Sequence, residues 1–274
     1  MNTATATTAP IHTELHQSVL RQTASLARRS IVGRLRQPAV LAPSFVFPLF
    51  FAALSASSYS RVKNAPGFPK VDSFLQFALA GAILQGAFFG AISGAADLAT
   101  DIEQGFWERL IASPVARTSI VIGRLTSATC VGGIQAAVFT GLLAIFGVRI
   151  RSGVVGVVGL IVAASLMALF VASLMSAVAI RSGSPEVVQG MFPLVFILMF
   201  LSSTFMDRHL MHGWFRSLVI VNPISSIAEG MRTFVISGDP GGRAFLHAWG
   251  YPAIGSVLAM GLSLIALRRR LAKS

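Results

Sequence analysis

Long apolar stretches restrict the fold of this sequence more than any other feature. Six of them run at roughly 39–60, 73–96, 118–147, 153–181, 185–206 and 245–267. A helix needs about 20 apolar residues to cross a bilayer, and each stretch provides them. Hydrophobic residues make up 54% of the chain and charged residues only 12%, which excludes an ordinary soluble domain. We therefore expect an all-α polytopic membrane protein with six transmembrane helices.

The basic residues indicate how these helices are oriented. The net charge is +12, but the arginines lie at the ends of apolar runs and do not gather in a separate basic domain, so we expect no nucleic-acid partner. Clusters at residues 28–36 and 268–270 flank the first and last spans. Because Lys and Arg near span ends favour the cytoplasmic side, both termini are predicted to be cytoplasmic. The predicted location is the cell (plasma) membrane, in particular a bacterial inner membrane.

Two segments precede the first span. Residues 1–14 are polar and rich in Ala and Thr, which predicts a disordered tail ahead of one membrane domain over 15–274. Residues 15–37 place aliphatic side chains on one face and arginines elsewhere. This pattern predicts an amphipathic helix lying in the plane of an anionic membrane surface.

A charged segment at 97–117 separates the second and third spans. Four of the chain's ten carboxylates lie there, at Asp97, Asp101, Glu103 and Glu108. Apolar residues recur at a spacing of four, at Ile102, Phe106 and Leu110, which predicts an amphipathic helix that Pro114 ends. Such a helix on the cytoplasmic side would rest on lipid headgroups or on another protein.

A second unusual segment lies between the fifth and sixth spans, over 207–244. Its apolar patches are interrupted by Asn222, Pro223, Glu229 and Arg232, which a lipid-exposed span would not carry. We expect two half-helices that enter the membrane from the outer side and leave on the same side, packed against protein.

An enzymatic interpretation has two possible sites. Asp207, His209 and His212 have a spacing that could ligate a metal, and Ser93 with His247 could form an intramembrane protease pair. We favour solvated loop residues and helix packing for these, and expect no catalytic residue and no metal. Packing within one subunit is also the expected role of a small-residue face at Ala82, Gly86, Gly90 and Gly94.

Nucleotide binding is not expected of this chain. The sequence contains no phosphate-binding loop of the G-x-x-x-x-G-K-[ST] type. Any ATP-driven work, with its ATP and Mg, would therefore belong to a partner polypeptide.

The chain resembles the ABC-2 type transporter permeases, in particular the daunorubicin-resistance-like branch. The segment from Glu103 to Arg117 is similar to the family's cytoplasmic signature, except that Phe106 and Trp107 are bulkier than the usual residues there. The segment from Asn222 to Arg232 is similar to its outer re-entrant element.

This resemblance implies a function and a set of contacts. A permease of this kind would export a hydrophobic drug-like, lipid or glycolipid substrate as a dimer, either of two copies or with a homologous permease. Two copies of a soluble ABC ATPase subunit would drive it. A coupling helix would contact the ATPase through Glu103, Gly105, Phe106, Trp107, Glu108, Arg109 and Leu110. The substrate path would lie where two protomers meet, with Phe88, Phe89, Met199 and Phe200 as candidates.

Overall fold

The computed structural model describes residues 12–107, 109 and 116–272, and all regular structure in them is helical. This confirms the all-α part of the predicted fold class for those residues. The helices are α1 (His12–Leu35), α2 (Pro38–Ser58), α3 (Phe74–Glu103), α5 (Arg117–Ile145), α6 (Gly153–Ser182), α7 (Pro185–Gly190), α8 (Phe192–Phe200), α9 (Gly213–Val221), α10 (Pro223–Ile236), α11 (Gly241–Phe245) and α12 (Tyr251–Leu271). Short 3₁₀ turns occupy Val62–Asn64 and Arg208–Leu210, and a π turn at Leu246–Gly250 joins α11 to α12.

Five helices among the described residues are long and apolar enough to cross a membrane. They are α2, α3, α5, α6 and the continuous Gly241–Leu271 helix. The predicted fifth span, 185–206, is instead divided into α7 and α8, which meet at Met191. Pro193 lies in the first turn of α8, and because it lacks an N–H it cannot bond to the carbonyl of Gln189 as a continuous helix would require.

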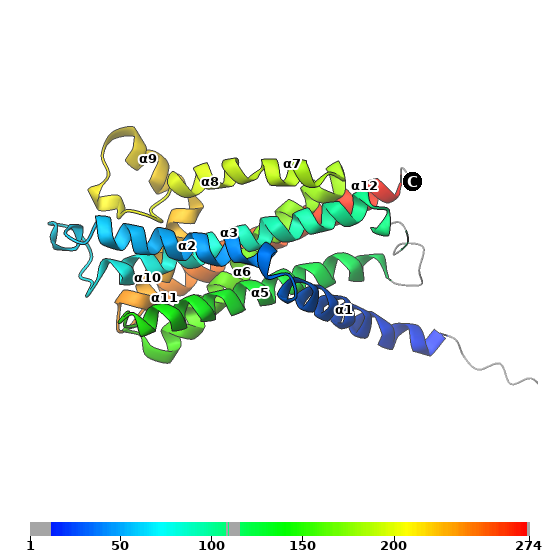
Figure 1. Cartoon of the computed structure of the whole chain (residues 1–274), viewed down its shortest axis with the longest axis horizontal. Helices are drawn as coiled ribbons and strands as arrows, with labels where there is room; N and C mark the ends of the chain where they lie inside the picture. The colour runs from blue at the N-terminus through cyan, green and yellow to red at the C-terminus, as the bar shows by residue number, and fades with distance from the viewer. Residues whose placement is uncertain (1–11, 108, 110–115, 273–274) are drawn as a thin grey trace, which may run out of the picture.

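The long helices run side by side along the longest axis of the molecule (Figure 1). Central α6 packs against α3, α5 and α12, while α1 packs mainly against α5. The ends of α3 and α12 lie together at what we call the inner end, and α9, α10 and α11 lie at the opposite, outer end (Figure 1).

The small-residue face of α3 packs inside the chain, as predicted. A Cβ at Gly86 would lie 2.8 Å from the side chains of Gln135 and Phe139 on α5, and one at Gly94 would overlap the guanidinium of Arg34 on α1. These glycines therefore leave room for two long polar side chains to reach α3.

One of those side chains, Gln135, compensates for a proline in α2. Pro48 has no N–H, so it leaves the carbonyl of Ser44 without its helical donor. The Nε2 group of Gln135 donates to this carbonyl at 2.6 Å, and Gln135 is only 1% exposed. Because an unpaired carbonyl in an apolar interior is costly, this bond holds α2 to α5.

We expect Gln135→Leu to lower the stability of the chain by about 1–3 kcal/mol, because it leaves the Ser44 carbonyl unpaired. Thermal unfolding in detergent measures the effect. The matched control is the double variant Gln135→Leu with Pro48→Ala, in which residue 48 again donates to Ser44. The double variant should lose less stability than the single one, and an equal loss would contradict the role given to this bond.

Candidate functional site

The charged segment after the second span begins with a sharp turn. Helix α3 runs on to Glu103, and Gly105 then adopts a φ of +69°. A left-handed residue interrupts a right-handed helix, and glycine adopts it at little cost. The expectation of one amphipathic helix over the whole segment is therefore wrong, because Asp97 and Asp101 belong to the last turns of α3.

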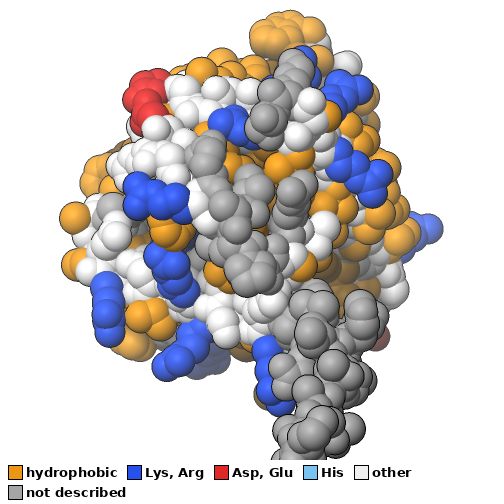
Figure 2. Space-filling model, turned by 90° about the vertical axis from the view of Figure 1, so that its right-hand side faces the viewer, with side chains coloured by type: hydrophobic (Ala, Val, Ile, Leu, Met, Phe, Trp, Pro, Cys, Tyr) orange, Lys and Arg blue, Asp and Glu red, His pale blue; other side chains and the backbone are white. Residues whose placement is uncertain are grey.

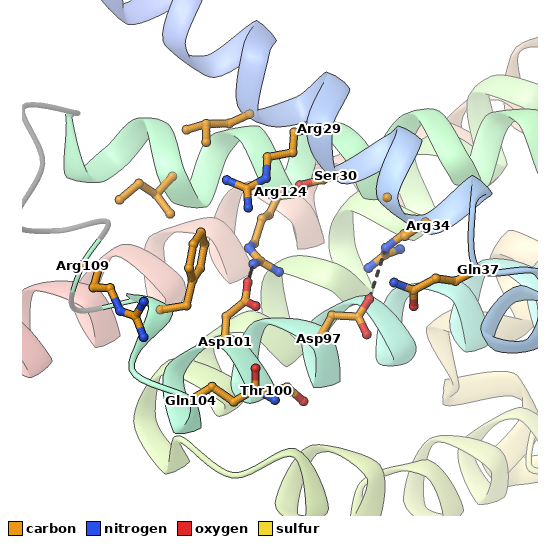
Figure 3. Close-up of a pocket in the computed structure, with 14 residues that line it drawn as sticks. Arg29, Ser30, Arg34, Gln37, Asp97, Thr100, Asp101, Gln104, Arg109 and Arg124 are labelled. Carbon is orange, nitrogen blue, oxygen red and sulfur yellow. Dashed lines mark hydrogen bonds and ion pairs between the residues drawn. The ribbon is translucent and has the colours of Figure 1, made fainter.

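Both of these carboxylates form ion pairs with arginines of neighbouring helices (Figure 3). The Nε atom of Arg34 on α1 lies 3.5 Å from a carboxylate oxygen of Asp97. A guanidinium nitrogen of Arg124 on α5 contacts Asp101. Because residues four apart share one helix face, the same side of α3 is attached to α1 and to α5.

Arg34 lies mostly inside the protein, with a side-chain exposure of 14%. Burial lowers the pKa of its guanidinium, and the Asp97 carboxylate acts in the opposite direction. An arginine nevertheless keeps its charge at neutral pH. The same guanidinium also donates to the backbone carbonyl of Gly90 at 3.3 Å, which fixes its position on α3.

These helices enclose a cavity of about 560 Å³ at the inner end, which we call the inner pocket (Figure 3). Its walls come from α1, from the end of α3, from the start of α5 and from Phe106 and Arg109. The lining residues are Leu26, Arg29, Ser30, Gly33, Arg34, Gln37, Asp97, Thr100, Asp101, Gln104, Phe106, Arg109, Ile120 and Arg124.

The predicted coupling residues differ in exposure. Glu103 and Arg109 are exposed, whereas Phe106 is half-buried, with the guanidinium carbon of Arg29 4.9 Å from its ring centroid. Trp107 is only 1% exposed and belongs to the hydrophobic core. Its predicted role as a direct anchor on a partner is therefore corrected: in this structure the indole fastens the segment to the membrane helices.

The charged segment ends beside α1, at Ala116. The backbone N–H of Ala116 donates to the side-chain oxygen of Gln22 at 3.2 Å. Glu108 and Leu110, two of the predicted contact residues, lie outside the described residues, as do Ser113 and Pro114.

The predicted outer element is built around Asn222 and Pro223. The Asn222 side-chain oxygen accepts from the N–H of Ile224 at 2.9 Å and so caps α10, where Pro223 is the first residue. Its Nδ2 group donates to the carbonyls of Leu198 and Leu201, each at 2.8 Å. One asparagine therefore joins the start of α10 to the end of α8.

Arg232 is the most buried charge of this element, with an exposure of 4%. It donates to the carbonyls of Ser203 and Thr204 at 2.8 and 3.2 Å, and its guanidinium carbon lies 3.7 Å from the ring centroid of Phe77. Glu229 pairs with Arg208 at 3.2 Å. These charges thus hold the outer end together, and the sequence pattern correctly predicted that they pack against protein.

The four predicted path residues divide into two pairs. Phe88 and Met199 are buried in the core, at 4% and 1% exposure. Phe89 and Phe200 belong to a seam of phenylalanine rings between α2, α3 and α8, in which Phe89 stacks on Phe192 with centroids 4.8 Å apart. The whole phenylalanine seam is Phe47, Phe51, Phe89, Phe192, Phe196, Phe200 and Phe205. The spacing of Phe192, Phe196 and Phe200 at intervals of four could have revealed it from the sequence.

The residues of the enzymatic interpretation do not assemble. Asp207 accepts from the backbone N–H of His209 at 2.8 Å, and the described residues contain no group of three or more potential metal ligands. Ser93 directly precedes Gly94, which faces Arg34 towards the inner end, whereas His247 packs beside Gly230 of α10 at the outer end.

Long apolar helices, a charged turn at one end and capped short helices at the other are the fold of a multi-pass membrane protein. The chain belongs to the ABC-2 type transporter family, whose model matches residues 21–235. It is 27% identical over 232 residues to the daunorubicin resistance ABC transporter permease protein DrrB1 of Streptomyces coeruleorubidus, covering 83% of this chain and 74% of that protein. It is 25% identical over 255 residues to the putative transport permease ycf38 of Porphyra purpurea, covering 90% and 85%.

A third relative is the probable doxorubicin resistance ABC transporter permease protein DrrC of Mycobacterium tuberculosis, 27% identical over 158 residues, or 58% of this chain and 56% of that protein. The chain is thus a multi-pass transmembrane permease subunit of an ABC exporter, and its family works with an ABC ATPase partner.

Proposed function

We propose that this permease moves a hydrophobic drug-like, lipid or glycolipid substrate outward, driven by two copies of a separate ATPase. ATP and Mg are bound by that ATPase and not by this chain. The permease works as a dimer, with a second copy or a homologous permease. The observation that carries the proposal is the turn at Gly105, which follows the exposed Glu103 at the end of α3 and is followed by the exposed Arg109, a residue that borders the inner pocket.

The coupling segment, residues 103–110, is the proposed seat of the ATPase. Glu103 and Arg109 are available for charge pairs with the partner, and Phe106 for an apolar contact, whereas Trp107 holds the segment to the core. When the ATPase closes on ATP, the coupling segment moves together with the end of α3. The ion pairs Arg34–Asp97 and Arg124–Asp101 transmit this movement from α3 to α1 and α5. Residues 108 and 110 complete the segment in this proposal.

The membrane arrangement has six crossings, with Pro185–Phe200 as the fifth. This pair of short helices extends roughly 24 Å, and the following residues complete the crossing. The inner end faces the cytoplasm with both termini, because basic side chains spread over it while acidic ones are few (Figure 2). Helix α1 packs beside α5 and continues past the inner end (Figure 1), and α9 and α10 enter from the outer side. The proposed location is a bacterial inner membrane.

The substrate path follows the phenylalanine seam. Of the four residues that the sequence predicted for the path, Phe89 and Phe200 belong to the phenylalanine seam. The other two, Phe88 and Met199, are buried in the core. Exposed apolar residues of α2 and α8 beside the seam, such as Phe50 and Leu194, suit a contact with a second protomer.

The decisive test of this function is co-purification with a soluble ABC ATPase, which we expect a neighbouring gene to encode, followed by drug-stimulated ATP hydrolysis in proteoliposomes. Glu103→Lys should reduce partner retention and export by roughly tenfold or more, because a charged contact becomes repulsive. Asp239→Lys is the matched control, since Asp239 is exposed at the outer end. Normal export by Glu103→Lys would remove the coupling segment from the mechanism.

The topology is tested separately by cysteine labelling in a Cys130→Ser background. Cysteines at Thr8, Pro66 and Leu210 are introduced one at a time, and intact cells are treated with an impermeant maleimide. We expect protection at residue 8 and labelling at residues 66 and 210. Tags at residues 208 and 240 should report the same side, because α9 and α10 lie at one end of the bundle (Figure 1). Tags on opposite sides would mean a seventh crossing.

A further inference from the structure

The inner pocket contains more positive charge than its ion pairs use. Four arginines line it, Arg29, Arg34, Arg109 and Arg124, against the two carboxylates of Asp97 and Asp101. Arg34 and Arg124 pair with these carboxylates. Among the described residues, Arg29 and Arg109 have no ion pair. Two exposed guanidinium groups therefore border the cavity without a carboxylate partner among the described residues.

These like charges lie close enough to repel one another. Arg124 is subject to Coulomb repulsion from both Arg29 and Arg34. Collecting guanidinium groups at a partly buried site is unfavourable unless an anion offsets the repulsion. The guanidinium groups border the same cavity from two helices, α1 and α5, and from the coupling segment (Figure 3), so a single bound anion could contact several of them.

We propose that the inner pocket binds the phosphate group of an anionic membrane lipid. Guanidinium groups bind phosphate oxygens in a bidentate manner, and Arg29 and Arg109 have no carboxylate partner among the described residues. A volume of about 560 Å³ admits a phosphate with its glycerol headgroup. Ser30, Thr100 and Gln104 add hydroxyl and amide groups that can bond the headgroup hydroxyls.

A lipid suits this site better than a soluble phosphate because of where the pocket lies. Gln37 lines it, and the candidate span of α2 begins only at Leu41, so the pocket is level with the start of a membrane helix. Leu26 and Ile120 add an apolar part to its wall. Anionic headgroups are concentrated at a cytoplasmic membrane surface, which favours their capture by arginines at this level.

A bound phosphate would join the parts that the proposed mechanism moves. Arg29 comes from α1, Arg109 from the coupling segment and Arg124 from α5, and their shared contact would hold these parts at fixed distances. This consequence depends on the proposed coupling, but the binding itself does not.

The test measures binding to the full-length chain in dodecyl maltoside by microscale thermophoresis. The probes are dioctanoyl phosphatidylglycerol, dioctanoyl phosphatidylcholine and inorganic phosphate. We expect phosphatidylglycerol to bind most tightly, because the choline cation is repelled by the pocket. Tighter binding of inorganic phosphate would assign the site to a soluble anion and overturn the lipid proposal.

Three variants locate the site. Arg29→Gln should weaken phosphatidylglycerol binding by roughly tenfold, because a charge-assisted bond is lost. Arg28→Gln is the matched control on the same helix, since Arg28 is exposed and does not line the pocket, and it should change the affinity less than twofold. Asp101→Asn frees Arg124 and should strengthen binding, an effect that misfolding cannot produce.

Two results would overturn the proposal. Equal losses in Arg28→Gln and Arg29→Gln would indicate diffuse attraction to the basic surface, and weaker binding in Asp101→Asn would show that the pocket is not an anion site. Because the measurement uses the permease alone, its failure is distinct from a failure of ATPase coupling.

Discussion

Arg232→Met is expected to cost the largest share of the protein's stability, about 3–5 kcal/mol. The guanidinium is buried, and its loss leaves the carbonyls of Ser203 and Thr204 without this donor and the buried Asp207 without a nearby cation. Because a domain is stable by only about 5–15 kcal/mol, most of the variant should aggregate or be degraded. Gel filtration in detergent and thermal unfolding measure the monodisperse fraction and the midpoint.

The control for this prediction is Arg243→Met. Arg243 is exposed near the same end, so the variant loses an equal charge without exposing a buried partner. It should change stability by no more than about 0.5 kcal/mol. If the two methionine variants unfold at the same temperature, the cluster around Arg232 does not hold the outer end together.

Gly105→Ala is expected to have the largest effect on export while leaving the fold intact. A side chain at a φ of +69° costs about 1–2 kcal/mol, and the segment can relieve it by continuing α3 past Glu103. The coupling residues would then point in a different direction, and ATP-driven export should fall by about tenfold. Export from inverted vesicles and retention of the ATPase are the measurements.

Gly147→Ala provides a matched comparison for this variant. Gly147 has a φ of +87° in the turn after α5, and a Cβ there would meet nothing within 4 Å. It therefore carries a similar backbone cost far from the coupling segment, and export should remain close to normal. A similar loss of export in both variants would attribute the effect to lower stability rather than to the turn at Gly105.

The sequence was sufficient to predict the long helices because a bilayer sets their minimum length. The predicted spans 118–147 and 153–181 match Arg117–Ile145 and Gly153–Ser182 closely. The presence of short helices in place of one lipid-facing span over 207–244 was also predictable, because Glu229 and Arg232 could not face lipid. Their partners were not, since Phe77 and Ser203 lie far from Arg232 in the sequence.

The inner end was the least predictable part. The second span was predicted to end at residue 96, and Asp97 and Asp101 were assigned to a separate amphipathic helix. Arg34 and Arg124 neutralise these carboxylates, and contacts between distant segments leave no periodic pattern in one sequence. Trp107 was predicted to face a partner for a similar reason: aromatic residues suit both interfaces and cores, and only the folded chain distinguishes them.

The length of α3 has a mechanical consequence. It is one proline-free helix over Phe74–Glu103, about 45 Å long, with Phe77 under Arg232 near one end and Asp101 near the other. A stiff rod of that length acts as a lever: a tilt of about 5° at the inner ion pairs displaces its far end by about 4 Å. Leu75, which is partly exposed in the first turn of α3, is therefore a suitable position for a fluorescent or spin probe that reports, at the outer end, a movement that starts at Gly105.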